Sequence, residues 1–411
     1  MQPLRKNFAD SAVKIIFKKI VLRKSKIILK SEIVLYELYN CFSMSYNTDK
    51  RVVMTLDAGG TNFVFSAVQA EKEIIEPVHL SAKGENLEAI LKNIIEGFNR
   101  IKLMINKKPV AISFSFPGPA DYENGIIGDL QNLPSFKGGV ALGPMLGETF
   151  GIPVFINNDG DLFAYGEAMS GLLPDINRQL EKVGNPKRYR NLLGVTFGTG
   201  FGGGIVTRGA LFQGDNSAQG EINRVRNGIF KQFDAEESVS IRGIKREYAN
   251  YTGINLASCP EPKEICEIGT GKKPGNREAA VKSFESFAIA AADALANAIT
   301  LVDGLIVIGG GLSGAYSLFL PKLVSEMNRP FETVAGQLLE RLEITAFNLE
   351  DETDLKKFLE PSAVEIAIPF STKKTLYDPI KKTGVGITRL GTSNAVSIGA
   401  YAYALQKMDA K

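Results

Sequence analysis

Blocks of hydrophobic and polar positions predict strands and helices in alternation along the chain. From residue 51, RVVMTLDAGGTNFVFSAVQ reads as an apolar strand, a glycine-rich turn and a second strand in which apolar and polar positions alternate. This is the pattern of a β-hairpin. Much later, NLLGVTFGTGFGGGIVTRGALF repeats the same plan. The two units predict a duplicated architecture with one glycine-rich loop in each half.

Segments with helical spacing lie between and after these hairpins. The longest is REAAVKSFESFAIAAADALANAITLVD, which leads into the apolar strand GLIVIGGGLSG, and AVSIGAYAYALQKM predicts a closing helix. Strands that alternate with helices indicate an α/β protein whose ligands bind at the carboxyl ends of strands. Three proline-rich or charged stretches, 171–191, 255–275 and 340–378, are predicted to be surface insertions.

Composition narrows the class of protein. The 411 residues exceed one ordinary domain, and 44% hydrophobic with 23% charged residues is typical of a globular chain with a sizeable core. A net charge of +3 argues against a nucleic-acid binder, and no apolar run is long enough for a membrane span. Three cysteines and one histidine exclude a disulfide framework and a histidine-rich metal site, which predicts a cytoplasmic protein.

The charge is concentrated near the start of the chain. Residues 1–43 hold nine basic and three acidic side chains in an apolar–basic pattern without a small-residue cleavage site. Three interpretations remain open: a loose extension upstream of the authentic start at Met44, a folded leader, or a targeting segment.

The loop Asp57-Ala-Gly-Gly-Thr-Asn62 follows the first predicted strand. Glycines allow backbone N–H groups to approach an anion, a threonine adds a donor, and a carboxylate can hold the Mg²⁺ that accompanies a nucleotide. The loop therefore predicts a phosphate-binding site. The alternative is a plain β-turn with a capping aspartate.

The second loop, Gly198-Thr-Gly-Phe-Gly-Gly-Gly204, satisfies the G-x-G-x-x-G pattern of dinucleotide-binding proteins. Glu221 lies downstream as a candidate ribose-binding acid, which makes an NAD-dependent oxidoreductase an alternative. That fingerprint requires a helix that begins at the glycines. Because the residues from Ile205 read as a strand, a second phosphate loop is the better interpretation.

Asn157-Asn-Asp159 stands where an apolar strand meets a helix. An aspartate there suits a general base for a hydroxyl group, with the amide orienting the substrate. The alternative is that Asp159 only caps the helix. Glu221 and Glu236, taken alone, read as surface charges.

Taken together, DAGGTN, PGPAD with NLPSF, INND, GTGFGGGI, AQGEI and VIGGGLSGA follow in that order from about residue 51 to about residue 407. In order and spacing they resemble the ROK family of sugar kinases and repressors, in the actin–hexokinase–chaperone ATPase superfamily. The resemblance implies an α/β, two-lobed actin-like ATPase (ribonuclease H-like) fold with duplicated β-sheet domains and a cleft between them. The implied division is a basic extension (1–49), an N-terminal lobe (50–158 plus 391–411) and a C-terminal lobe (159–390).

The resemblance also implies roles for single residues. The first phosphate loop corresponds to Asp57, Gly59, Gly60, Thr61 and Asn62, with Asp57 also binding Mg²⁺. The second corresponds to Thr199, Gly200, Gly202 and Gly203, and Gly309, Gly310 and Gly311 would lie beside the adenosine of ATP. Sugar-contacting positions correspond to Gly118, Asn132, Asn158, Asp159, Glu221 and Glu236, with Asp159 as the catalytic base.

Two departures from the family pattern concern residues 222–240. Most relatives have a histidine three residues after the glutamate, followed by a cysteine-rich zinc loop; here that position is Arg224, and the loop contains no cysteine. No zinc site is therefore expected. We expect apolar residues (Ile229, Phe230, Phe233) and the pairing of Arg224 with a neighbouring carboxylate, such as Glu236 or Glu221, to order the loop.

The implied activity is ATP-dependent phosphorylation of a hexose of the glucose, mannose or N-acetylglucosamine type at its 6-OH. ATP and Mg²⁺ are the implied cofactors, and a homodimer without nucleic-acid or membrane partners is expected. A sugar-binding transcriptional regulator of the same family is the alternative, but it needs a DNA-binding domain for which the leader is too short.

Overall fold

The computed structural model describes residues 46–410 except 59–61, 83, 85, 119 and 129–133. Four predicted site residues, Gly59, Gly60, Thr61 and Asn132, lie outside the described residues. The same holds for the interpretations of residues 1–43.

The first six-stranded sheet contains the first predicted hairpin. Its strands run in the order β3-β2-β1-β5-β8, with β4 also paired to β2. β1 and β2 are antiparallel, which confirms the hairpin, whereas β1, β5 and β8 are parallel. The carboxyl ends of these three strands therefore share one edge of the sheet. The strands are β1 (Val53–Ala58), β2 (Asn62–Gln69), β3 (Lys72–Glu73), β4 (Val78–Ser81), β5 (Ala111–Ser115) and β8 (Val154–Asn157).

The second six-stranded sheet repeats this plan with the order β11-β10-β9-β12-β18-β15. β9 and β10 form the second predicted hairpin, and β12, β18 and β15 run parallel to β9. A strand after the second glycine-rich loop, where the dinucleotide fingerprint requires a helix, removes the support for an oxidoreductase. The strands are β9 (Leu192–Phe197), β10 (Phe201–Thr207), β11 (Ala210–Leu211), β12 (Leu305–Gly309), β15 (Thr345–Asn348) and β18 (Lys382–Ile387).

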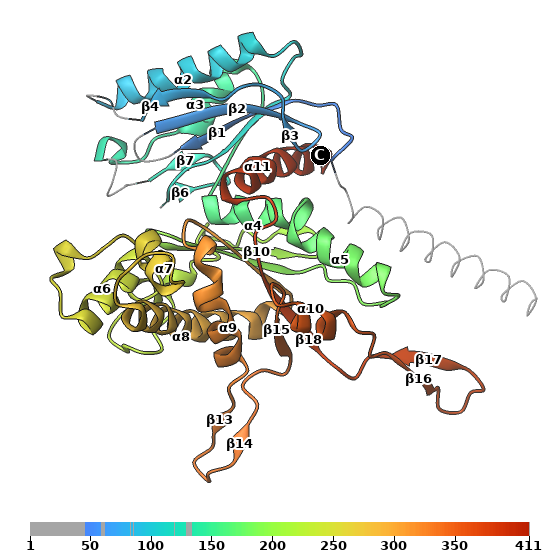
Figure 1. The fold of residues 1–411 in the computed structure, drawn as a ribbon. Coiled ribbons are helices and arrows are strands. Elements are labelled where there is room, and N and C mark those ends of the chain that lie inside the picture. Colours follow the sequence, from blue (N-terminus) through green and yellow to red (C-terminus); the bar gives the residue numbers. More distant parts are fainter. Residues whose placement is uncertain are drawn as a thin grey trace, which may run out of the picture. The chain divides into compact units, whose positions relative to one another are not determined.

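Helices surround both sheets, and three short ribbons lie outside them (Figure 1). The helices are α2 (Leu87–Met104), α3 (Leu142–Phe150), α4 (Asp159–Met169), α5 (Leu172–Lys182), α6 (Ile241–Thr252), α7 (Pro262–Gly269), α8 (Arg277–Val302), α9 (Tyr316–Met327), α10 (Glu352–Leu359) and α11 (Thr392–Asp409). The ribbons are β6 (Ala120–Asp121) with β7 (Ile126–Ile127), β13 (Phe331–Glu332) with β14 (Leu338–Leu339), and β16 (Val364–Ala367) with β17 (Lys374–Tyr377).

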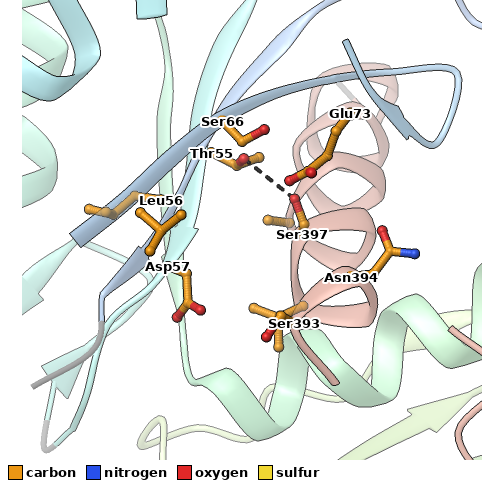
Figure 2. A pocket seen from close by; sticks show the side chains of 11 residues that line it. Thr55, Leu56, Asp57, Ser66, Glu73, Ser393, Asn394 and Ser397 are labelled. Carbon is orange, nitrogen blue, oxygen red and sulfur yellow. Dashed lines mark hydrogen bonds between the residues drawn. The ribbon is translucent and has the colours of Figure 1, made fainter. Parts of the chain in front are cut away.

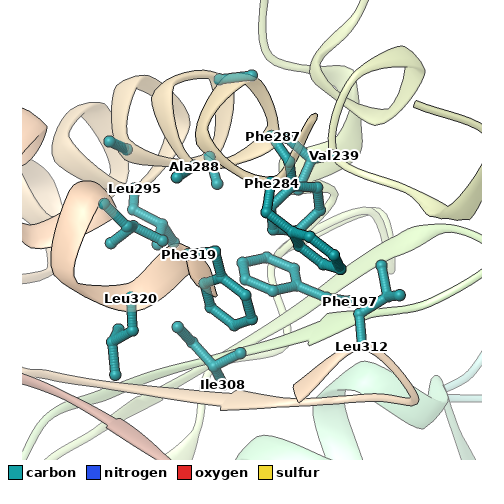
Figure 3. Packing of buried hydrophobic residues seen from close by; sticks show 14 of the residues in the cluster. Phe197, Val239, Phe284, Phe287, Ala288, Leu295, Ile308, Leu312, Phe319 and Leu320 are labelled. Carbon is teal, nitrogen blue, oxygen red and sulfur yellow. The ribbon is translucent and has the colours of Figure 1, made fainter. Parts of the chain in front are cut away.

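An aromatic cluster holds α8 and α9 against the second sheet. Figure 3 shows the rings of Phe197, Phe287 and Phe319 meeting, with centroids 5.1–5.8 Å apart. Each such buried side chain contributes about 1.5–3 kcal/mol. Among the described helices, α8 alone is long and apolar enough to span a membrane. Its apolar residues belong to this core, which accounts for its composition.

Helices α4 and α11 cross where both backbones carry a glycine. α11 also packs on β1 and β5, while α4 packs on β9 and β10. A Cβ atom at Gly166 or Gly399 would overlap a backbone carbonyl of the other helix, that of Ala395 or Leu162. Glycine at these positions is therefore required for the crossing that links the two sheets.

The predicted surface insertions are wrong in part, because each contributes to the core. In 171–191, α5 buries Leu172, Leu173, Ile176 and Leu180. In 255–275, α7 buries Ile265 and Ile268. In 340–378, β15 is a strand of the second sheet, and only the β16–β17 part is exposed throughout. Charged residues on the outer faces of these segments concealed their apolar faces.

Candidate active site

A cavity of about 410 Å³ lies beyond the carboxyl ends of β8, β9 and β12. It brings together nine of the predicted site residues: Asn158, Asp159, Thr199, Gly200, Gly202, Gly203, Glu221, Glu236 and Gly310. Its other lining residues are Thr196, Gly198, Phe201, Gly220, Asn223, Thr392 and Val396. Segments far apart in sequence thus meet at one polar cavity.

Asp159 is the first residue of α4, and Asn158 is its cap. The side-chain Oδ1 of Asn158 accepts a hydrogen bond from the backbone N–H of Gly160 at 2.8 Å, and Asp159 Oδ1 accepts from the same group at 2.9 Å. The cap residue of α4 is therefore Asn158 and not Asp159. Burial by the surrounding protein raises the pKa of Asp159, although the hydrogen bond from Gly160 opposes this shift.

Glu221 and Glu236 both line the cavity, but their carboxylates differ in hydrogen bonding. Glu221 is exposed and its side chain has no hydrogen-bond partner among the described residues. Glu236 is already engaged, because its Oε2 accepts from the backbone N–H of Phe201 at 3.0 Å and its Oε1 accepts from Arg242 at 3.0 Å. Glu236 therefore braces the turn between β9 and β10, whereas the carboxylate of Glu221 is open to a ligand.

Three backbone segments approach closely at the inner wall of the cavity. A Cβ atom at Gly203 would lie 2.6 Å from the carbonyl oxygen of Gly220, and one at Gly160 would lie 2.6 Å from that of Gly203. Gly220 itself has φ of +73°. The packing of α4, β10 and the segment before Glu221 thus requires glycine at these positions, independently of any phosphate contact.

Asp57 lines a neighbouring cavity of about 270 Å³ between β1, β2 and the first turns of α11. Figure 2 shows Asp57 at the same end of this cavity as Ser393, with Thr55 and Ser397 in contact above them. Burial, followed by the charge of Asp159, raises the pKa of Asp57. Asp57 lies near the carboxyl end of β1 and Asp159 follows β8, and the two carboxylates are close enough to affect one another electrostatically.

The remaining predicted residues differ in position. Gly310 has φ of +85° and its N–H donates to Thr392 Oγ1 at 2.8 Å, so it joins β12 to the start of α11. Gly309 is buried against Phe163, and Gly311 is exposed. Asn62 and Gly118 are exposed outside the cavity lining.

Sequence reasoning missed a buried polar pair behind the cavity. Asp161 is 1% exposed, and its Oδ2 accepts from Gln219 Nε2 at 2.7 Å. Burial raises the pKa of Asp161 well above its ordinary value. The pair ties α4 to the segment that carries Glu221. Its only signal in the sequence was a second acidic residue two positions after Asp159.

Asn223 is a second missed residue. It lines the cavity two positions after Glu221, and its buried Oδ1 has no partner among the described residues. An unpaired acceptor in a cavity wall is a candidate for hydrogen bonding to a ligand.

Asn227 organises the loop from 222 to 240. Its Nδ2 donates to the carbonyl of Asp234 at 3.0 Å and to Ser238 Oγ at 2.9 Å, while its Oδ1 accepts from the N–H groups of Ile229 and Phe230. Asn227 is 1% exposed. One buried amide therefore connects both ends of the loop.

Arg224 does pair with a neighbouring carboxylate, but with neither Glu221 nor Glu236. Arg224 is exposed and its nearest acidic partner is Asp234 at 3.8 Å, while Glu236 pairs with Arg242 instead. The apolar residues expected to order the loop differ in burial. Ile229 and Phe233 are about 40% exposed, whereas Phe230 is half-buried, with its ring centroid 6.1 Å from that of Phe233 and its ring under the guanidinium of Arg246. Among the described residues, no group of three or more His, Cys, Asp or Glu side chains forms a metal site.

Comparison with known proteins relates this geometry to a family. A model of the ROK family matches residues 53–353. The crystal structure of glucokinase from Parabacteroides distasonis is 53% identical, with a TM-score of 0.82 over 88% of this chain and 99% of that one. N-acetyl-D-glucosamine kinase of Vibrio cholerae is 27% identical over 68% of this chain and 90% of its own length, and glucokinase of Thermotoga maritima is 27% identical over 71% and 94%.

Proposed function

The chain belongs to the ROK family and has its two-lobed actin-like fold, and we propose on that basis the reaction its cavity carries out. The protein is an ATP-dependent hexose kinase. The observation that carries the mechanism is the meeting of Asp159 and Glu221 with the β9–β10 turn in one cavity. The cavity is thus lined by a carboxylate base, by polar side chains that have no partners among the described residues, and by the glycine-rich turn between β9 and β10.

Asp159 is the proposed general base. Phosphoryl transfer depends on positioning and on neutralising charge more than on covalent chemistry, and a carboxylate that accepts the proton of the attacking hydroxyl completes it. The raised pKa of Asp159 makes its carboxylate a stronger base than that of a free aspartate. We assign the attacking group as the 6-OH of the sugar.

Sugar binding is assigned to the open polar groups around Asp159. Glu221 offers a free carboxylate, Asn223 offers an unpaired acceptor, and Asn158 holds the start of α4 in place. Hydroxyl groups of a hexose are suitable donors for all of these acceptors. Glu236 acts through the backbone of Phe201, which fixes the turn that faces the ATP phosphates.

The residues present fit Mg²⁺ bound together with ATP. Mg²⁺ is usually held by one or two carboxylates and the substrate phosphates. Asp57 supplies one carboxylate, and its raised pKa, due in part to Asp159, indicates a site that a cation would stabilise. When bound, Mg²⁺ would neutralise phosphate charge. Thr199, Gly200 and Gly310 would lie along the phosphates and adenosine.

Glucose is the proposed preferred hexose, because the relative with 53% identity is a glucokinase. Purified protein with Mg-ATP should be assayed for ADP release with glucose, mannose and N-acetylglucosamine. We expect the highest kcat/KM for glucose and glucose 6-phosphate as the product. ADP release that does not depend on any hexose would refute the kinase assignment, and a preference for N-acetylglucosamine would refute only the choice of sugar.

The remaining expectations concern the setting of the enzyme. A nearly balanced charge and a hexose as substrate favour a cytoplasmic enzyme without nucleic-acid or membrane partners. A homodimer is the expected assembly.

A further inference from the structure

Two ribbons leave the second sheet at the end opposite the cavity. β13–β14 precedes β15, and β16–β17 precedes β18 (Figure 1). β15 and β18 are parallel and begin side by side, where the N–H of Thr345 donates to the carbonyl of Lys381 at 3.0 Å. The active-site cavity lies at the carboxyl ends of the strands of this sheet, so these ribbons do not line the cavity.

The β16–β17 ribbon, here called the arm (residues 361–380), has one apolar face. In its register Val364 lies opposite Tyr377 and Ile366 lies opposite Thr375, so these four side chains share a face. Alternation of apolar and polar residues at period two is the pattern of a strand with one buried face. The sequence of the arm therefore predicts a cover over this face.

The described part of the chain supplies no such cover. All residues from 364 to 377 are exposed. The opposite face is more polar, because Lys374 pairs there with Glu365 at 3.1 Å, although it also carries Ala367 and the exposed Leu376. An isolated two-stranded ribbon is marginally stable in water, and burial of its apolar face is the usual remedy.

The tip of the arm presents an aromatic side chain in a strained conformation. Phe370 is fully exposed, with φ of +60°. A bulky residue in the left-handed region is unfavourable, and such strain persists where the surroundings or a function maintain it. Aromatic side chains that enter a pocket are the usual anchors of protein interfaces.

A pocket lies at the base of the same arm. It has a volume of about 410 Å³ and is lined by Val183, Leu355 and Leu359, with Glu352, Lys356 and Glu360 at its rim. Glu360 is the residue immediately before the arm. The rim carries a net negative charge, whereas the tip carries Lys373 on the apolar face, opposite Ile368.

We propose that the arm docks on a second copy of this chain, with Phe370 of each copy in the pocket of the other. A pocket at the base and an anchor at the tip match when two arms run antiparallel about a two-fold axis, which is the reciprocal contact of a symmetric dimer. Lys373 of one copy then faces Glu360 of the other. A standard interface covers about 800 Å² per partner. The exposed Val364, Ile366, Phe370 and Tyr377 of each arm and the pocket would all contribute to such an interface.

The test is the mass of the full-length protein in sedimentation velocity over a range of micromolar concentrations. We expect a dimer, and Phe370→Asn should weaken dimerisation roughly 10-fold or more, because asparagine tolerates the left-handed backbone while the anchor is lost. The matched control is the exchange Glu365→Lys with Lys374→Glu, which preserves the ion pair on the opposite face and should leave the dimer unchanged.

A charge exchange tests the proposed contact between Lys373 and Glu360 without changing Phe370. Glu360→Lys and Lys373→Glu should each weaken the dimer, and the two together should restore it. Because the arm is remote from the cavity, kcat/KM per chain should stay within about twofold in all these variants. A wild-type monomer, a dimer that Phe370→Asn does not weaken, or charge variants that fail to compensate would overturn the proposal. These outcomes are independent of which sugar is phosphorylated.

Discussion

At the scale of the residue, Asp159 and Asp161 lie on one turn of α4 but have different surroundings and different roles. Asp159 faces the cavity beside the open carboxylate of Glu221, whereas Asp161 points behind it to Gln219. Burial raises the pKa of both. The raised pKa makes the carboxylate of Asp159 a better base. For Asp161, the raised pKa means that its ionised form is unfavourable in the folded protein.

Asp159→Asn should lower kcat by about 10²–10⁴, the usual contribution of a general base. The amide keeps the size of the side chain, so the KM for the hexose and the thermal midpoint should change little. Steady-state kinetics with thermal unfolding as the folding control checks this. A variant that phosphorylates hexose at nearly the wild-type rate would remove Asp159 from the reaction.

Asp161→Asn should stabilise the protein at pH 7 and much less at pH 4. Below the unfolded-state pKa of about 3.9 Asp161 is protonated in both states, and the penalty grows as pH rises towards its raised folded-state pKa. The new amide can donate to Gln219 Oε1, which has no partner among the described residues. Thermal midpoints at both pH values should differ from wild type by a few °C at pH 7. An equal change in the thermal midpoint at pH 4 and pH 7, or a lower midpoint of the variant at pH 7, would contradict the assignment of a buried charge to Asp161.

At the scale of the element, the loop from 222 to 240 shows how one buried amide orders a segment. Asn227 makes four hydrogen bonds within it, and the loop follows Glu221 and contains Glu236, both of which line the cavity. Side-chain hydrogen bonds of this kind are short-range and directional, so loss of the amide leaves several backbone groups unpaired.

Asn227→Ala should cost about 1–3 kcal/mol of stability and raise the KM for the hexose. Arg224→Ala is the matched control in the same loop, and because Arg224 is exposed with a distant partner, it should leave both quantities nearly unchanged. Chemical denaturation and steady-state kinetics measure the two effects. An Arg224 variant with the larger effect would restore the pairing expected from the sequence.

At the scale of the whole molecule, the described residues from 46 onwards hold both sheets and every residue that lines the cavity. Tyr46 already belongs to this unit: it is 4% exposed and its ring packs edge-on against Tyr401 of α11. The described unit therefore includes Tyr46, two positions after Met44.

A chain that starts at Met44 should be as active as the full chain and should unfold at nearly the same temperature. The comparison needs only kcat, KM and a thermal scan of both proteins. Loss of solubility or of activity on removal of residues 1–43 would show that the basic segment contributes to folding or function.

The sequence by itself determined the features that depend on neighbouring residues. Alternating strands around glycine-rich turns specify the β1–β2 and β9–β10 hairpins, and helical spacing specifies α8, because these patterns follow from local backbone geometry. Ordered motifs identified the family and most residues of the cavity wall. Where one residue has two local roles, as at Asn158 and Asp159, the pattern alone left both open.

The tertiary structure decided which side chains meet across the fold. Asp161 reaches Gln219, Glu236 braces Phe201, and Arg224 lacks the partners expected of it, because each contact joins segments that no periodic pattern relates. The same reason applies to the stretches expected to be insertions: their apolar faces are short, and only the surrounding helices and strands show which face is buried. Local patterns specify elements, whereas burial and pairing are properties of the assembled fold.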